Sequence, residues 1–147
     1  TGYKQVLGKA KIPYREEYVY IWGRDAVADV TESADKGYYL TKALLERTPE
    51  VTAFVCMNDA MALGAFKAVR EAGKKVPDDL SVIGFDNDFI SNYVSPTLTT
   101  VEIQKEEVGR AAMEALLALI RNEKLDKEIS FAARLIIRES TEKNKNK

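Results

Sequence analysis

The most informative pattern in the chain is a pair of short apolar runs with one amphipathic segment between them. The runs cover residues 53–57 and 81–85. Asn58 directly follows the first run, and Asp86 directly follows the second. Residues 59–72 carry apolar side chains at helical spacing, so the pattern predicts a strand, a helix and a second strand. Ligands of parallel sheets bind beyond the carboxyl ends of the strands, so we expect Asn58 and Asp86 to be ligand contacts in a protein that binds rather than catalyses.

The rest of the chain continues the alternation of helices and strands. The predicted elements, in chain order, are a helix over 2–10, a strand over 17–22, a loop over 23–36, a helix over 37–47, a strand over 52–57, a helix over 59–72, a strand over 81–85, an irregular segment over 89–96, a short strand over 98–101, a helix over 106–122, a strand over 129–137 and a disordered tail from 141. Such alternation predicts an α/β fold of three layers, in which a mainly parallel sheet is flanked by helices. The run 81–85 shows no polar alternation, which predicts that this strand is buried on both faces.

Composition narrows the classes of function. The chain has 147 residues, which suits one domain, and a net charge of -1, which gives no electrostatic footprint for nucleic acid. Contact with DNA therefore has to come from a segment outside this chain. The single cysteine, Cys56, lies in an apolar run, so we expect a small buried side chain and no disulfide, as in a reducing compartment.

The sequence carries no signal for catalysis, a cofactor or a membrane. It has no histidine, which removes the usual general base and the commonest metal ligand. It has neither a glycine-rich phosphate loop nor a nucleophile elbow, and no apolar run approaches the ~18 residues that a membrane span needs. The sequence therefore predicts no catalytic residues, no metal, no cofactor and no membrane partner.

Four short motifs occur in an order and spacing that are specific as a set. They are NDAMALG at 58–64, VPDDLSVIGFD at 76–86, PTLTTV at 96–101 and IREST at 137–141. With these motifs the chain resembles the effector-binding domain of the lactose/galactose repressor (LacI/GalR) family of bacterial transcription regulators. The resemblance extends from residue 2 to residue 141. Each motif is weak alone, and four in series make chance agreement a poor explanation.

The resemblance implies a particular place within a larger protein. Regulators of this family carry an N-terminal helix-turn-helix headpiece and a two-lobed sensor of the periplasmic-binding-protein type I fold, with the effector in the cleft between the lobes. This chain resembles the C-terminal lobe and would begin after the headpiece and most of the first lobe. The implied division is 1–98 for the C-terminal lobe, 99–127 for a strand and helix that cross into the N-terminal lobe, 128–140 for the returning closing strand, and 141–147 for the disordered tail.

The resemblance also assigns roles to individual residues. Asn58 and Asp86 match family positions that reach the effector, and Asp86 matches the acidic position that holds ligand hydroxyls. Each has a structural alternative, because Asn58 also suits the cap of the following helix and Asp86 also suits a turn. An arginine that the family uses lies before Gly2 and falls outside the chain. Trp22 and Val30 are candidates for the residue that stacks on the ligand, although Trp22 also suits core or interface packing.

The function that the resemblance implies is that of a sensor in a cytoplasmic transcription regulator. Binding of a small molecule, expected to be a sugar, would shift the regulator between two states, while operator DNA is bound through the headpiece. The family also implies a homodimer that pairs through this lobe, near the helix matching 59–73. The alternative is a periplasmic sugar-binding protein of a transporter, which would share the fold. The free Cys56 and the closing motif 138–141 favour the regulator.

Overall fold

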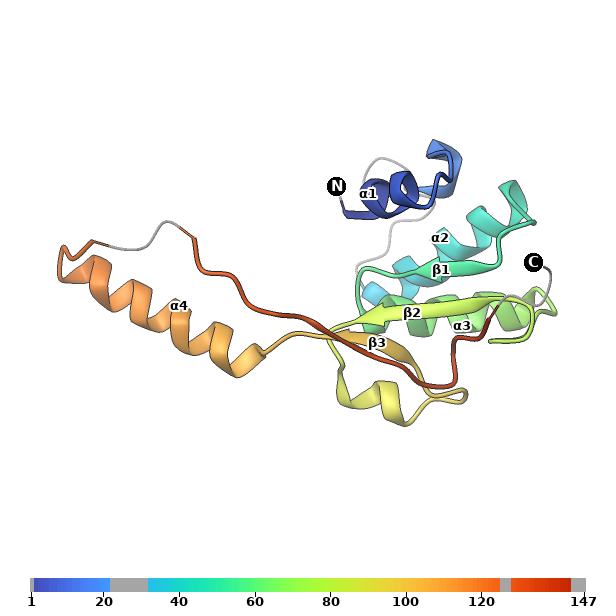
Figure 1. Cartoon of the computed structure of the whole chain (residues 1–147). Coiled ribbons are helices and arrows are strands. Elements are labelled where there is room, and N and C mark those ends of the chain that lie inside the picture. The colour runs from blue at the N-terminus through green and yellow to red at the C-terminus, as the bar shows by residue number, and fades with distance from the viewer. Residues whose placement is uncertain (1, 22–31, 125–127, 144–147) are drawn as a thin grey trace.

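A mixed sheet of four strands forms the centre of the fold, with helices packed on it and one helix standing away from it (Figure 1). The computed structural model describes residues 2–21, 32–124 and 128–143. Its elements, in chain order, are α1 (Gly2–Lys9), the 3-10 helix η1 (Glu16–Tyr18), α2 (Ser33–Arg47), β1 (Ala53–Val55), α3 (Asp59–Glu71), β2 (Ser81–Phe85), the 3-10 helix η2 (Phe89–Asn92), β3 (Thr99–Glu102), α4 (Lys105–Ile120) and β4 (Arg134–Ile136).

The sheet has the strand order β1-β2-β3-β4, and its first three strands run parallel. Val55 of β1 lies beside Ile83 of β2, and Phe85 of β2 lies beside Val101 of β3. β4 pairs antiparallel to β3. The predicted α/β fold with a mainly parallel sheet is therefore confirmed. Because β1, β2 and β3 run in one direction, their carboxyl ends meet at the same edge of the sheet.

The core lies between the sheet and the helices α2 and α3. Phe54 of β1 and Val82 of β2 are buried, while the residues that flank them in the strands are more exposed, as expected for alternating side chains. The cluster of buried apolar residues comprises Leu44, Leu45, Phe54, Ala62, Ala65, Val69, Leu80, Val82 and Leu98. This core fixes where β1, β2 and α3 end, and so where the polar residues at those ends lie.

Two glycines allow α2 and α3 to approach closely. A Cβ atom on Gly37 would lie 2.1 Å from the carbonyl oxygen of Met61, and one on Gly64 would lie 1.8 Å from that of Ala34. No side chain fits at such distances, so the close contact of the two helices depends on glycine at both positions.

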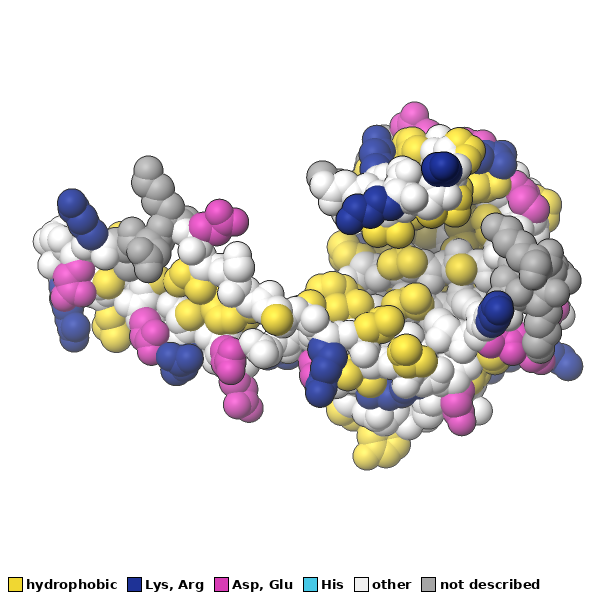
Figure 2. Space-filling model, in the orientation of Figure 1, with side chains coloured by type: hydrophobic (Ala, Val, Ile, Leu, Met, Phe, Trp, Pro, Cys, Tyr) yellow, Lys and Arg dark blue, Asp and Glu magenta, His cyan; other side chains and the backbone are white. Residues whose placement is uncertain are grey.

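The other face of the sheet is more accessible than the sequence predicted. Val55 is 77% exposed and Phe85 is 36% exposed. The expectation that the strand 81–85 is buried on both faces is wrong, because α2 and α3 pack on one face and leave the side chains of the other face accessible. Apolar side chains can be seen on the surface of the main body in Figure 2.

The strand predicted over 17–22 is absent from the described residues 17–21, and Trp22 lies outside them. The segment forms η1 instead, with local hydrogen bonds from Tyr18 N to the oxygen of Arg15 and from Val19 N to the oxygen of Glu16. These local bonds use backbone groups that a strand would present to a neighbour.

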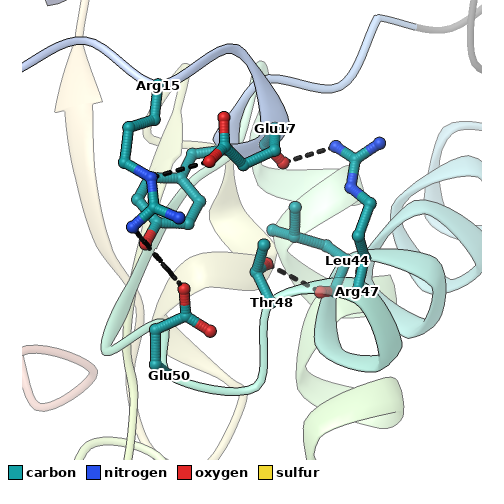
Figure 3. A network of polar contacts seen from close by, with 7 residues as sticks. Arg15, Glu17, Leu44, Arg47, Thr48 and Glu50 are labelled. Carbon is teal, nitrogen blue, oxygen red and sulfur yellow. Dashed lines mark hydrogen bonds and ion pairs between the residues drawn. The ribbon is translucent and has the colours of Figure 1, made fainter.

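A polar cluster attaches this segment to α2 (Figure 3). The Arg15 side chain pairs with Glu17 at 2.7 Å and with Glu50 at 3.8 Å, and Arg47 of α2 donates a hydrogen bond to the Glu17 carbonyl oxygen. Thr48 closes the end of α2 through a 2.8 Å hydrogen bond to the oxygen of Leu44. Ion pairs as exposed as those of Arg15 contribute little to the stability of the whole fold. We therefore assign this cluster only the role of attaching the η1 segment to α2.

The helix α4 makes the largest departure from an ordinary globular fold. It projects away from the sheet, connected by β3 on one side and by the segment that returns to β4 on the other (Figure 1). None of its 16 residues is buried, and its large apolar side chains are exposed, including Met113 at 56% and Ile120 at 68%. An amphipathic helix gains most of its stability from a partner surface, so this apolar side is suited to one.

The remaining differences from prediction concern the bounds of elements. The helix expected over 37–47 begins four residues earlier, at Ser33, and the strand expected over 129–137 is confined to Arg134–Ile136. The segment expected to be irregular over 89–96 contains η2. Residues 144–147 of the predicted tail lie outside the described part of the chain. Over the described ranges, no helix combines the length and the apolar character that crossing a bilayer requires.

Candidate functional site

The polar residues predicted at the ends of the first two strands lie at one edge of the sheet. β1 and β2 are parallel neighbours, Asn58 precedes α3 just after β1, and Asp86 directly follows β2. The edge formed by the carboxyl ends of parallel strands is where α/β proteins bind ligands, so the geometry matches the prediction on this point.

Asp86 lines an open pocket of about 370 Å³ between the end of β2 and the start of α4. The other lining residues are Asn87, Glu102, Ile103, Gln104, Lys105, Glu106 and Glu107. Within the described part of the chain, the half-buried Asp86 carboxylate takes part in no side-chain hydrogen bond. Both of its oxygens can therefore accept hydrogen bonds from a ligand.

The backbone that carries Asp86 is strained. Asp86 has a φ of +106° and Asn87 a φ of +46°. The Asn87 value is close to the left-handed region that asparagine tolerates, whereas +106° lies outside it, and such conformations cost about 1–3 kcal/mol. Three successive amides of the turn are anchored to neighbouring elements. They are Asp86 N to Val101 O at 2.8 Å, Asn87 N to Thr100 Oγ1 at 3.2 Å, and Asp88 N to Asp59 Oδ2 at 2.7 Å.

Asp59 is a residue of the site that the pattern of strand ends did not identify. Its side chain is buried at the start of α3, with 1% of the residue exposed. Asp59 Oδ1 accepts a 2.6 Å hydrogen bond from the Thr100 hydroxyl, while its Oδ2 accepts the bond from Asp88 N. A Cβ atom on Gly84 would lie 2.1 Å from Asp59 Oδ1, so glycine is required there. A lone glycine inside a strand indicates close approach of another group, and Gly84 was the signal that could have identified this contact.

Asn58 caps the helix α3 with its side chain. Its Oδ1 accepts a 2.8 Å hydrogen bond from the amide of Met61, and its backbone is extended, as is typical of a cap residue. The Nδ2 atom has no partner within the described residues and remains able to donate to a ligand. The role of Asn58 as a helix cap is therefore confirmed. The cap uses only the oxygen end of the carboxamide.

Asn87 joins the turn to both strands that lead to α4. Its Nδ2 donates to Glu102 Oε1 of β3 at 2.7 Å, and its Oδ1 accepts from Arg138 Nη2 at 2.7 Å. Glu102 Oε2 accepts a 2.7 Å bond from Arg134 of β4. These bonds favour the charged carboxylate, so the hydrogen bond from Asn87, followed by that from Arg134, lowers the pKa of Glu102 below its usual value. The sequence did not predict these contacts of Asn87, which arise from the tertiary structure.

Neither an activated cysteine nor a metal cluster is found among the described residues. Burial, with a smaller contribution from Asp59, raises the pKa of the Cys56 thiol to about 12, so it is not an activated nucleophile. Over the described ranges, no group of three or more histidine, cysteine, aspartate or glutamate side chains could hold a metal ion. The stacking candidates Trp22 and Val30 lie outside the described residues.

Comparison with known proteins places this geometry in a family. A model of the periplasmic binding protein-like domain matches residues 1–141. The HTH-type transcriptional repressor PurR of Vibrio atlanticus (strain LGP32) is 36% identical over 146 residues, which cover 99% of this chain and 41% of the repressor. The crystal structure of the transcription regulator CcpA of Lactococcus lactis gives a TM-score of 0.82 at 30% identity, covering 96% of this chain and 49% of that chain. The complex of the transcriptional regulator CelR with cellobiose gives a TM-score of 0.82 at 30% identity, covering 95% and 40%. The chain thus spans less than half the length of these relatives.

Proposed function

This chain belongs to the periplasmic binding protein-like domain family, in the form found in LacI/GalR-family regulators, and we propose that it is the C-terminal lobe of an effector sensor in a bacterial transcription regulator. The observation that carries the proposal is the Asp86 carboxylate, which stands in an open pocket without an internal hydrogen bond among the described residues. A carboxylate in this position can accept hydrogen bonds from two hydroxyl groups, and charge-assisted hydrogen bonds of this kind are strong.

The effector class that fits this chemistry is a sugar or a similar small polyhydroxyl compound. Such ligands present paired hydroxyls, which match the two oxygens of Asp86, while the unengaged Nδ2 of Asn58 donates to a ligand oxygen. The complex of CelR with cellobiose supports this class. Asn58 and Asp86 are therefore the proposed effector contacts, and the open shape of the pocket fits one half of a cleft.

The exposed helix α4 supports a division of the chain between two lobes. We assign residues 1–98 and 128–140 to the C-terminal lobe and residues 99–127 to a crossing strand and helix that complete the N-terminal lobe. The absence of any buried residue on α4 supports this assignment, since the helix would cover its apolar side on that lobe. In the whole regulator, effector binding between the lobes would favour the closed state.

The family also guides the proposals for the whole regulator. Operator DNA would be bound by a headpiece upstream of this chain, whose own net charge is -1. Two copies would pair through this lobe near α3, and the regulator would act in the cytoplasm without catalysing a reaction. Analytical ultracentrifugation of the whole regulator tests the pairing, and a purely monomeric species at micromolar concentration would contradict it.

Calorimetric titration of the whole regulator with a panel of mono- and disaccharides that includes cellobiose tests the proposed effector site. We expect one member of the panel to bind, and Asp86→Ala to weaken that binding about 10- to 100-fold, because a hydrogen bond to a charged group contributes about 1.5–3 kcal/mol. The matched control is Asp78→Ala, which removes an exposed carboxylate from the turn before β2. Unchanged affinity in Asp86→Ala would remove that residue from the site, and failure of the whole panel would exclude the sugar class.

A further inference from the structure

We propose that Asn87 is a positioning residue that couples the direction of β3 and β4, and with it the position of α4, to the orientation of the Asp86 carboxylate. The inference rests on the proposed function, in which Asp86 contacts the effector. Its test uses no effector, so that either proposal can fail without the other.

The strands β3 and β4 connect α4 to the part of the fold that contains the turn. β3 leads directly into α4, and the chain returns from α4 through β4, so these two strands form the connection between α4 and the main body (Figure 1). Any change in the direction of α4 has to be accommodated in this pair of strands or in the residues that flank them.

This connection contacts the turn through polar side chains. The Asn87 carboxamide donates to Glu102, the last residue of β3, and accepts from Arg138, two residues beyond β4. Glu102 binds Arg134 of β4 through its second oxygen. One carboxamide is therefore held at once from the end of β3 and from the segment that follows β4, and Asn87 directly follows Asp86 in the strained turn.

An asparagine suits this position because its side chain both donates and accepts hydrogen bonds. A carboxamide offers a donor to Glu102 and an acceptor to Arg138, whereas an aspartate offers only acceptors and would repel Glu102. The backbone of the turn is anchored separately through the amides of Asp86, Asn87 and Asp88. The side chain of Asn87 is thus a link between the turn and the strands in addition to the anchors that hold the turn itself.

The test is a double-mutant cycle of Arg134→Ala and Asn87→Ala in the whole regulator. Its readout is the rate of hydrogen–deuterium exchange in a peptide that covers residues 84–90. Arg134 reaches the turn through Glu102, so Arg134→Ala perturbs the strands without removing a direct contact of the turn. We expect Arg134→Ala to accelerate exchange in this peptide about threefold when Asn87 is present and to have no effect when Asn87 is replaced by Ala. A residue that merely stabilised the turn would leave the effect of Arg134→Ala unchanged.

Two further variants serve as a control and as a substitute for Asn87→Ala. Asn92→Ala removes an exposed asparagine five residues along the chain and should leave the effect of Arg134→Ala at its full size. If Asn87→Ala does not fold, Asn87→Asp keeps the acceptor for Arg138 and loses the donor to Glu102, and the effect of Arg134→Ala should again disappear. An equal response to Arg134→Ala with Asn87 and with either substitution, or no response with Asn87 present, would overturn the proposal.

Discussion

The ends of β1 and β2 both carry polar side chains, yet the two sets are engaged in different ways. At the end of β1, Asn58 Oδ1 caps α3 and the buried Asp59 carboxylate accepts two hydrogen bonds. At the end of β2, the Asp86 carboxylate faces an open pocket and has no internal side-chain hydrogen bond within the described ranges. The comparison teaches that a polar residue after a strand becomes available to a ligand when other groups hold the backbone around it.

Asp59→Ala should produce the largest effect, because it removes the group that joins the two strand ends. The substitution leaves the buried Thr100 hydroxyl and the Asp88 amide without their acceptor. We expect the free energy of unfolding to fall by about 2–4 kcal/mol, measured by urea denaturation. Asp79→Ala, at an exposed residue whose side chain accepts one local hydrogen bond, is the control. A loss as small as that of the control would show that the two strand ends are not joined through Asp59.

Asp86→Gly should stabilise the protein while removing its proposed effector contact. Glycine relieves a strained φ of +106°, worth about 1–3 kcal/mol, and loses about 0.4–1 kcal/mol through its more flexible unfolded state. The expected net gain is about 1 kcal/mol in the free energy of unfolding, accompanied by loss of sugar binding. Asp86→Ala, which keeps the strain, should not gain this stability. A destabilised Asp86→Gly would show that the carboxylate has a structural role like that of Asp59.

Asn58 allows its capping and binding roles to be separated. Asn58→Ala should lower the free energy of unfolding by about 1 kcal/mol, because the amide of Met61 loses its acceptor. Asn58→Ser restores a capping oxygen but not the donor at Nδ2, so we expect near-normal stability with weaker effector binding. Thermal unfolding and calorimetry on the same samples distinguish these outcomes. Normal binding in Asn58→Ser would limit Asn58 to the cap.

The smallest expected effect is a pH dependence of stability at Glu102, the last residue of β3. The pKa of Glu102 is lowered in the folded state, so its carboxylate stabilises the fold above its ordinary pKa, and this contribution is lost as the pH falls through the lowered value. Between about pH 5 and about pH 3, the urea midpoint of the wild-type protein should therefore fall slightly more than that of Glu102→Gln. Parallel curves for the two proteins would show that the bonds from Asn87 and Arg134 do not favour the charged form in solution.

The outcome for individual elements shows which signals in the sequence were sufficient. The strand Ser81–Phe85 was predicted with its observed bounds and α3 to within one residue, because the apolar pattern and the cap agreed there. The same kind of pattern predicted a strand over 17–22. This prediction was wrong for the described residues 17–21, because the backbone amides of Tyr18 and Val19 form local hydrogen bonds instead. A strand needs a partner, and partners are not visible in local periodicity.

The sequence by itself determined the α/β class, the order of β1, α3 and β2, and the presence of Asn58 and Asp86 at neighbouring strand ends. These features depend on local periodicity and on the rule that parallel strands share one binding edge. Only the tertiary structure decided that Asp59 is buried against Gly84 and that Asn87 joins Glu102 to Arg138. Those contacts link residues up to 51 positions apart, and their geometry follows from how whole elements pack rather than from any local pattern.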